Sequence, residues 1–160
     1  MKQAKLLSKK EIRRLAAVID SRRYPTRNHT AVALSFYAGM RACEIAALRI
    51  SDVFDSTGAV RDTVLLKATQ TKGSCTSTDL INQRTAKALA QYAKQYPRRL
   101  QQPDAPLIFS AKGGGFSAQT MVNLFYSLYT GAHIEGASSH SGRRQFVTEL
   151  ADKGLNARVV

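Results

Sequence analysis

The sequence lacks tryptophan and has little cysteine, proline or acidic side chain. Its 160 residues include two cysteines, four prolines and 11 Asp plus Glu, against 24 Lys plus Arg. Cys43 and Cys75 stand far apart and without metal-type spacing, so we expect two free thiols in a reducing compartment. The fold must therefore rest on a hydrophobic core, for which this length and a 44% hydrophobic content suffice.

Long apolar runs are absent as well. No run approaches the roughly 18 residues of a membrane span, and no signal peptide opens the chain. We therefore expect a cytoplasmic protein without a membrane partner. His29 and His133 have no Cys, Asp or Glu at metal-ligand spacing, and Lys112 precedes three glycines without the rest of a P-loop. We expect no metal and no small-molecule cofactor.

The surplus of basic residues is the most informative feature of the composition. The formal net charge is +13 at pH 7, and the excess is concentrated in residues 1–30 and 67–115, while the rest of the chain is close to neutral. Such an imbalance favours a polyanionic partner, most commonly a nucleic acid. For the N-terminal segment, a merely solvated basic helix face (Lys10, Arg13, Arg14) remains the alternative.

Local patterns predict the α+β class, mainly helical with one small antiparallel β-hairpin. Ser8 and Glu11 form a capping box before a helical apolar pattern, and Asn82 and Ser117 stand at the starts of two further patterns. The predicted helices cover 9–22, 28–38, a segment from 42, 83–96, 118–130 and 140–153, and the hairpin covers 60–81. Gly39 is expected to stop the second helix, so Arg41 falls in the joint before the third.

A histidine and an arginine stand three residues apart at the start of the last predicted helix. His140 and Arg143 would lie on one helix face, where an imidazole and a guanidinium could meet one phosphate close to the helix N-terminus. The pair alone is a weak signal, because an exposed polar helix start produces it equally well.

A second motif lies at the joint before the third predicted helix. Residues 39–53 read GMRACEIAALRISDV. This segment resembles the motif around the first catalytic arginine of the tyrosine recombinases, or phage integrases, and matches it at its Gly, Arg, Glu, Leu and Asp positions with unbroken spacing. The matched arginine is Arg41, and the matched glutamate is Glu44.

The remaining motifs of the family follow in the right order. Lys72 falls on the predicted hairpin turn, where the family carries its catalytic lysine. His140 and Arg143 occupy the H-x-x-R position, with matching residues at the offsets that follow. Three motifs in sequence are far more specific than any one, and the resemblance extends from about residue 8 to the end.

The resemblance implies the catalytic-domain fold of the DNA breaking–rejoining enzymes and a role for each matched residue. In the family, a tyrosine attacks a phosphate of double-stranded DNA and forms a 3′-phosphotyrosine, without metal or ATP. Arg41 and Arg143 would hold the non-bridging oxygens, because the charge that builds there needs fixed cationic donors. Lys72 would act as general acid and His140 as proton acceptor. Glu44 would hold the Arg41 side chain in place and would not itself contact the substrate.

Two positions near the H-x-x-R motif depart from the common pattern. Arg144 stands where many members carry histidine, and we expect it to add to DNA binding. Gly142 follows Ser141 where Asp-Leu is common, and glycine weakens a helix by up to about 1 kcal/mol relative to alanine.

The resemblance predicts one integrase-type catalytic domain over residues 1–160, incomplete at the C-terminus and without the family's N-terminal DNA-clamping domain. All six tyrosines precede His140, so none occupies the nucleophile position. The chain by itself is therefore expected to be inactive in strand cleavage and rejoining. Two interpretations stay open: a portion of a site-specific recombinase, which would also contact other recombinase subunits, or a naturally truncated, non-catalytic DNA-binding remnant or regulator.

Overall fold

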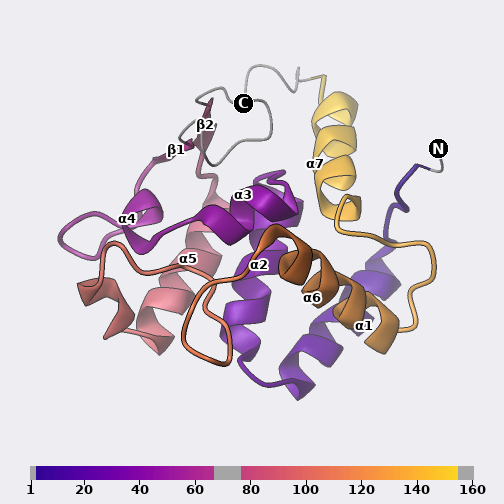
Figure 1. The fold of residues 1–160 in the computed structure, drawn as a ribbon. Helices are drawn as coiled ribbons and strands as arrows, with labels where there is room; N and C mark the ends of the chain where they lie inside the picture. The colour runs from indigo at the N-terminus through magenta and orange to yellow at the C-terminus, as the bar shows by residue number, and fades with distance from the viewer. Residues whose placement is uncertain (1–2, 67–76, 155–160) are drawn as a thin grey trace.

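The structure, a computed structural model, describes residues 3–66 and 77–154 and is mainly helical (Figure 1). This confirms the predicted class. In chain order the elements are α1 (Lys9–Ser21), α2 (Pro25–Tyr37), α3 (Ala42–Ala47), α4 (Ile50–Val53), β1 (Thr63–Leu66), β2 (Ser77–Leu80), α5 (Gln83–Gln95), the 3₁₀-helix η2 (Arg99–Gln101), α6 (Ala118–Gly131) and α7 (Ser141–Asp152). The strands β1 and β2 pair antiparallel, with Thr63 opposite Leu80.

Side-chain caps fix the starts of three helices where the sequence predicted them. Ser8, Asn82 and Ser117 each accept a hydrogen bond from the backbone N–H three residues later, at 3.2, 2.9 and 3.1 Å. Each bond satisfies an N–H group that has no partner inside its helix. Because a cap is a local interaction, it can be recognised in the sequence.

The start of α2 differs from the prediction by three residues. Tyr24 adopts a left-handed backbone conformation with φ 57°, and Pro25 then opens the helix. Proline is well suited to this first position, since it has no N–H group to satisfy there and its φ is already helical. The short helices α4 and η2 were not predicted, because four and three residues are too few to show a helical period.

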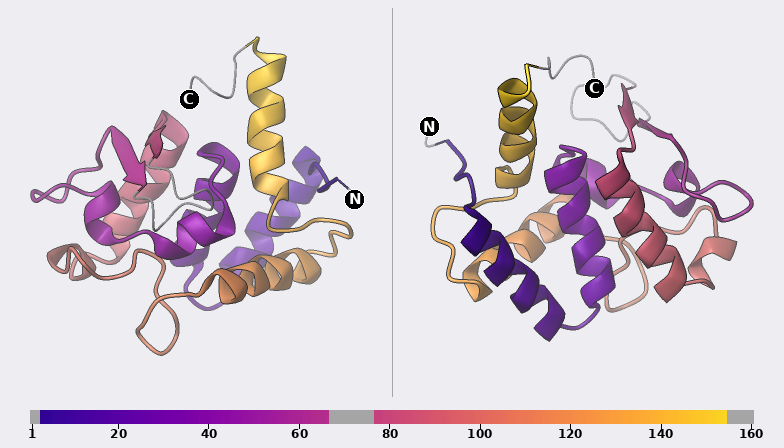
Figure 2. Two further views of the ribbon diagram at one scale, coloured as in Figure 1. Left: turned by 45° about the horizontal axis from the view of Figure 1, so that its top comes forward. Right: turned by 180° about the vertical axis from the view of Figure 1, so that it is seen from behind.

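The helix α2 lies at the centre of the fold and packs against α1, α3, α5 and α7. Seen from behind in Figure 2, α1, α2 and α5 lie side by side, while α7 rises beside the N-terminal segment. Ala31, Leu34 and Phe36 of α2 are buried in the main hydrophobic cluster. None of the helices in residues 3–66 and 77–154 combines the length and the apolar character needed to cross a lipid bilayer.

Gly142 explains how α7 comes so close to α2. A Cβ atom at this position would lie 2.9 Å from the carbonyl carbon of Ser35 and 2.9 Å from the ring of Phe36. Gly142 and Ser35 are both buried. The glycine that looked unfavourable for the helix is therefore the residue that permits this helix contact.

We predict that Gly142→Ala destabilises the protein although alanine is the better helix former. Overpacking costs about 1–3 kcal/mol, and we expect the upper part of this range because the contacts at 2.9 Å include the backbone of Ser35; the gain in helix propensity is only roughly 1 kcal/mol. Urea unfolding should show a net loss of about 1–2 kcal/mol. The control is Gly114→Ala, since Gly114 is exposed and its added Cβ would have only Ser110 Oγ at 4.0 Å. A Gly142→Ala protein as stable as the parent would contradict the packing argument.

Candidate functional site

Arg41 lies in the joint between α2 and α3, as predicted, and Glu44 holds it there. Glu44 Oε2 accepts a hydrogen bond from the Arg41 backbone N–H at 2.8 Å, and Oε1 accepts one from the guanidinium Nη1 at 3.0 Å. The Glu44 side chain is only 4% exposed, whereas that of Arg41 is 39% exposed. The result is a cation anchored on its protein side and open on the other, which is the arrangement required for binding an anion.

Arg143 reaches the same segment from the other end of the sequence. Its Nη1 donates a hydrogen bond of 2.8 Å to the carbonyl oxygen of Gly39, 104 residues earlier. Gly39 has a φ of +68°, a conformation that favours glycine, and the Phe146 ring occupies the space that a Cβ would need. The first turns of α7 are thus tied to the residues just before Arg41.

His140 immediately precedes α7 and is exposed to solvent. Its backbone N–H donates to Ser138 Oγ at 3.2 Å. The imidazole forms no hydrogen bond with the residues that the structure describes, so both ring nitrogens stay available. His140 and Arg143 lie at the N-terminal end of α7, where the helix dipole favours an anion.

Among the predicted site residues, Glu44 contacts Arg41, and Arg143 contacts Gly39, two residues before Arg41. His140 is the N-cap of the helix that carries Arg143. Lys72 lies outside the described residues. The strands β1 and β2, which precede and follow residues 67–76, pair antiparallel as predicted. The contact between Arg143 and Gly39 was not predicted, because nothing in the local sequence indicates a partner so far away.

Arg144 extends in another direction from Arg143. Its guanidinium donates to the carbonyl of Ala4 through Nη1 and to Gln3 Oε1, at 2.8 Å, through Nη2. Both partners belong to the N-terminal segment. The role of Arg144 in DNA binding therefore stays a prediction. In the structure its side chain is hydrogen-bonded to the N-terminal segment.

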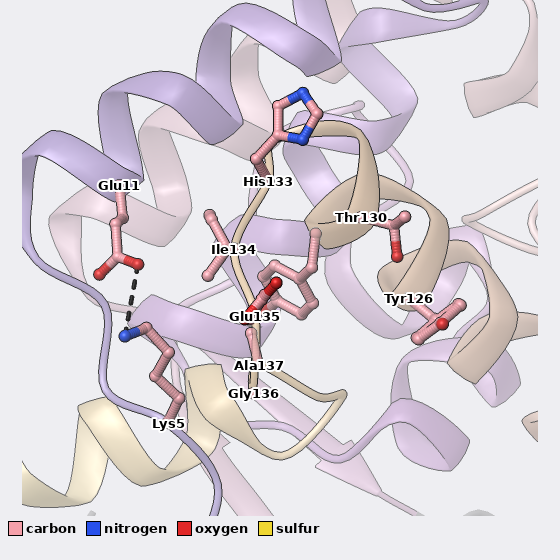
Figure 3. A pocket seen from close by; sticks show the side chains of 10 residues that line it. Lys5, Glu11, Tyr126, Thr130, His133, Ile134, Glu135, Gly136 and Ala137 are labelled. Carbon is pink, nitrogen blue, oxygen red and sulfur yellow. Dashed lines mark ion pairs between the residues drawn. The ribbon is translucent and has the colours of Figure 1, made fainter.

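An open cavity of about 630 Å³ lies near the N-terminal segment and does not include the predicted site residues (Figure 3). Lys5 and Glu11 form an ion pair of 3.4 Å on one side, and Thr130 and Glu135 line the other. Its two glutamates make it a poor place for a phosphate. Within residues 3–66 and 77–154, no three His, Cys, Asp or Glu side chains gather as a metal site would require.

Comparisons with known proteins identify the family and the fold. The sequence profile of the phage integrase family matches residues 5–160. A crystal structure of XerA recombinase has a TM-score of 0.74 and 23% identity, covering 99% of this chain and 54% of that chain. No curated protein matches the sequence significantly.

Two further solved structures share the fold. For the integrase of mycobacterium phage Brujita, the TM-score is 0.66 and the identity 20%, over 99% of this chain and 48% of that chain. The Tn1549 transposon integrase in complex with a circular intermediate DNA has a TM-score of 0.74 and 15% identity, covering 99% of this chain and 57% of that chain. The present chain thus spans about half the length of the structures it matches.

We predict that the Glu44 carboxylate contributes more to the free energy of unfolding than Glu11, its less buried counterpart in α1. Glu11 occupies the same capping-box position as Glu44 and also pairs with a cation, but its side chain is 16% exposed. Glu44→Gln places an amide NH₂ against a donor in a buried site, and we expect a cost of about 1–3 kcal/mol. Glu11→Gln should cost less than about 1 kcal/mol. Equal losses in urea unfolding would show that Glu44 is no special anchor for Arg41.

Proposed function

This chain belongs to the phage integrase family, and on that premise we propose that it is the DNA-binding catalytic-domain portion of a site-specific tyrosine recombinase. The observation that carries the proposal is the hydrogen bond from Arg143 to Gly39. It joins the two arginine motifs, which are far apart in sequence, through a contact two residues from Arg41. Two fixed guanidinium groups so placed suit the non-bridging oxygens of one phosphate.

Each residue of the site then has a role that follows from its chemistry. Arg41 and Arg143 neutralise the charge that builds on the phosphorus centre, since an arginine stays protonated throughout. Lys72 can release a proton to the leaving oxygen, and His140 can accept one from the attacking group. Glu44 acts on Arg41 alone, because its carboxylate is buried and already bonded there.

Double-stranded DNA is the partner that we propose for this site. The Tn1549 integrase was solved with circular intermediate DNA, and XerH recombinase with its difH substrate. The net charge of +13 is consistent with such a partner. If backbone phosphates dominate the contacts, binding weakens steeply with salt, with a slope of about 0.9 per phosphate in log K against log salt.

We predict that Arg41→Ala and Arg143→Ala each weaken duplex binding by about tenfold or more, since charge-assisted bonds to phosphate are worth about 1.5–3 kcal/mol. Each loss should also reduce the salt slope by about 0.9. Binding is measured by fluorescence anisotropy over a range of salt concentrations.

Two exposed basic residues of α1 serve as controls for this experiment. Lys9→Ala and Arg13→Ala each remove a charge outside the site, and we expect an effect of about twofold or less. Because Arg41→Ala leaves the buried Glu44 carboxylate without its guanidinium, circular dichroism must first show that each variant is folded. Equal losses for all four variants would mean that the two arginines form no special phosphate site.

A further inference from the structure

The N-terminal strap, which we define as residues 3–8, is bound to α7 directly after Arg143. The side-chain amide of Gln145 pairs with both backbone groups of Leu7: Oε1 accepts from the N–H at 2.9 Å, and Nε2 donates to the carbonyl at 3.3 Å. Arg144 donates to Ala4 and Gln3 of the same strap. Leu7 itself is buried in the core with 5% exposure. The strap is therefore an integral part of the packing around α7.

The same strap also contacts the loop that leads into α7. The backbone N–H of Lys5 donates to the carbonyl of Gly136 at 3.4 Å, and Lys5 Nζ pairs with Glu11 of α1. Figure 3 shows Lys5 and Glu11 facing one another across from the chain at Gly136 and Ala137. His140 thus lies between two segments that the strap contacts, one on each side of it in sequence.

Three consecutive residues of α7 are attached to two separate parts of the protein, the segment at Gly39 and the strap. Arg143 binds Gly39, Arg144 binds residues 3 and 4, and Gln145 binds Leu7. Successive residues of an α-helix point about 100° apart around its axis. Contacts made by neighbouring residues to separate segments therefore oppose rotation of the helix, and this rotation sets where the Arg143 and His140 side chains point.

We propose that Arg144 and Gln145 are positioning residues, which fix the rotation of α7 through the N-terminal strap and so place Arg143 and His140 on the DNA phosphate. This inference rests on the proposed function of the site. It gives Arg144 an indirect role, in contrast to the direct phosphate contact predicted from the sequence. Gln145 provides the sharper test, because it carries no charge and its loss removes no attraction to DNA.

Gln145→Ala, in the 160-residue chain, should weaken binding to a DNA duplex by about threefold to tenfold. The salt slope should fall toward that of Arg143→Ala, although no charge has been removed, because a misplaced Arg143 no longer neutralises its phosphate. A loss of general stability would leave this slope unchanged, as long as binding is measured well below the unfolding temperature. Gln95→Ala, at an exposed glutamine of α5, is the matched control and should leave both quantities unchanged.

Double variants complete the experiment. With Arg143→Ala already present, Gln145→Ala should weaken binding much less than it does alone, since only His140 is left to be misplaced. Arg144→Ala combined with Gln145→Ala should lose less than the sum of the two single losses. If Arg143→Ala weakens binding but Gln145→Ala changes neither affinity nor slope, the positioning proposal fails alone. If Arg143→Ala itself behaves like Lys9→Ala, the proposed function fails and the positioning proposal fails with it.

Discussion

The hydrogen bond from the Arg143 guanidinium to the Gly39 carbonyl is the contact on which the site depends. It requires a glycine at position 39, because the backbone there has φ +68° and Phe146 fills the space of a Cβ. It also requires that α7 approach α2 closely, which Gly142 permits. Two glycines on different segments thus make possible one contact between motifs 104 residues apart, and Glu44 completes the arrangement by holding Arg41.

The basic composition pointed to a polyanionic partner, yet part of it serves the fold. Arg27 is buried, bonded to Asn28 and to the carbonyl of Phe109, and burial lowers its pKa. Arg99 donates to Tyr92 and to the carbonyl of Pro106, and lies over the Phe109 ring. Side chains so engaged are unavailable to a phosphate. Net charge therefore indicates the class of partner, while burial and hydrogen bonding show which cations can reach it.

The sequence predicted interactions between residues close together in the chain, and it did not predict those between residues far apart. Helix starts at Ser8, Asn82 and Ser117 were predictable because a cap involves residues three apart. The family was predictable because motif order and spacing carry the resemblance, and the phage integrase profile confirms it; the role of each site residue stays a prediction. Two hydrogen bonds could not be predicted, the one from Arg143 to Gly39 and the one from Arg144 to the strap. Both join residues more than 100 positions apart. Gly142 was misjudged for the same reason: its helix propensity is local, whereas its packing is not.

The central claim is that Arg41 and Arg143 act on one phosphate, and a double-mutant cycle on duplex binding tests it most directly. If both guanidinium groups bind the same phosphate, removing the first displaces that phosphate from the second. The loss in Arg41→Ala combined with Arg143→Ala should then fall short of the sum of the single losses by about 1 kcal/mol or more. Losses that add within about 0.5 kcal/mol would show two independent contacts and would contradict the account.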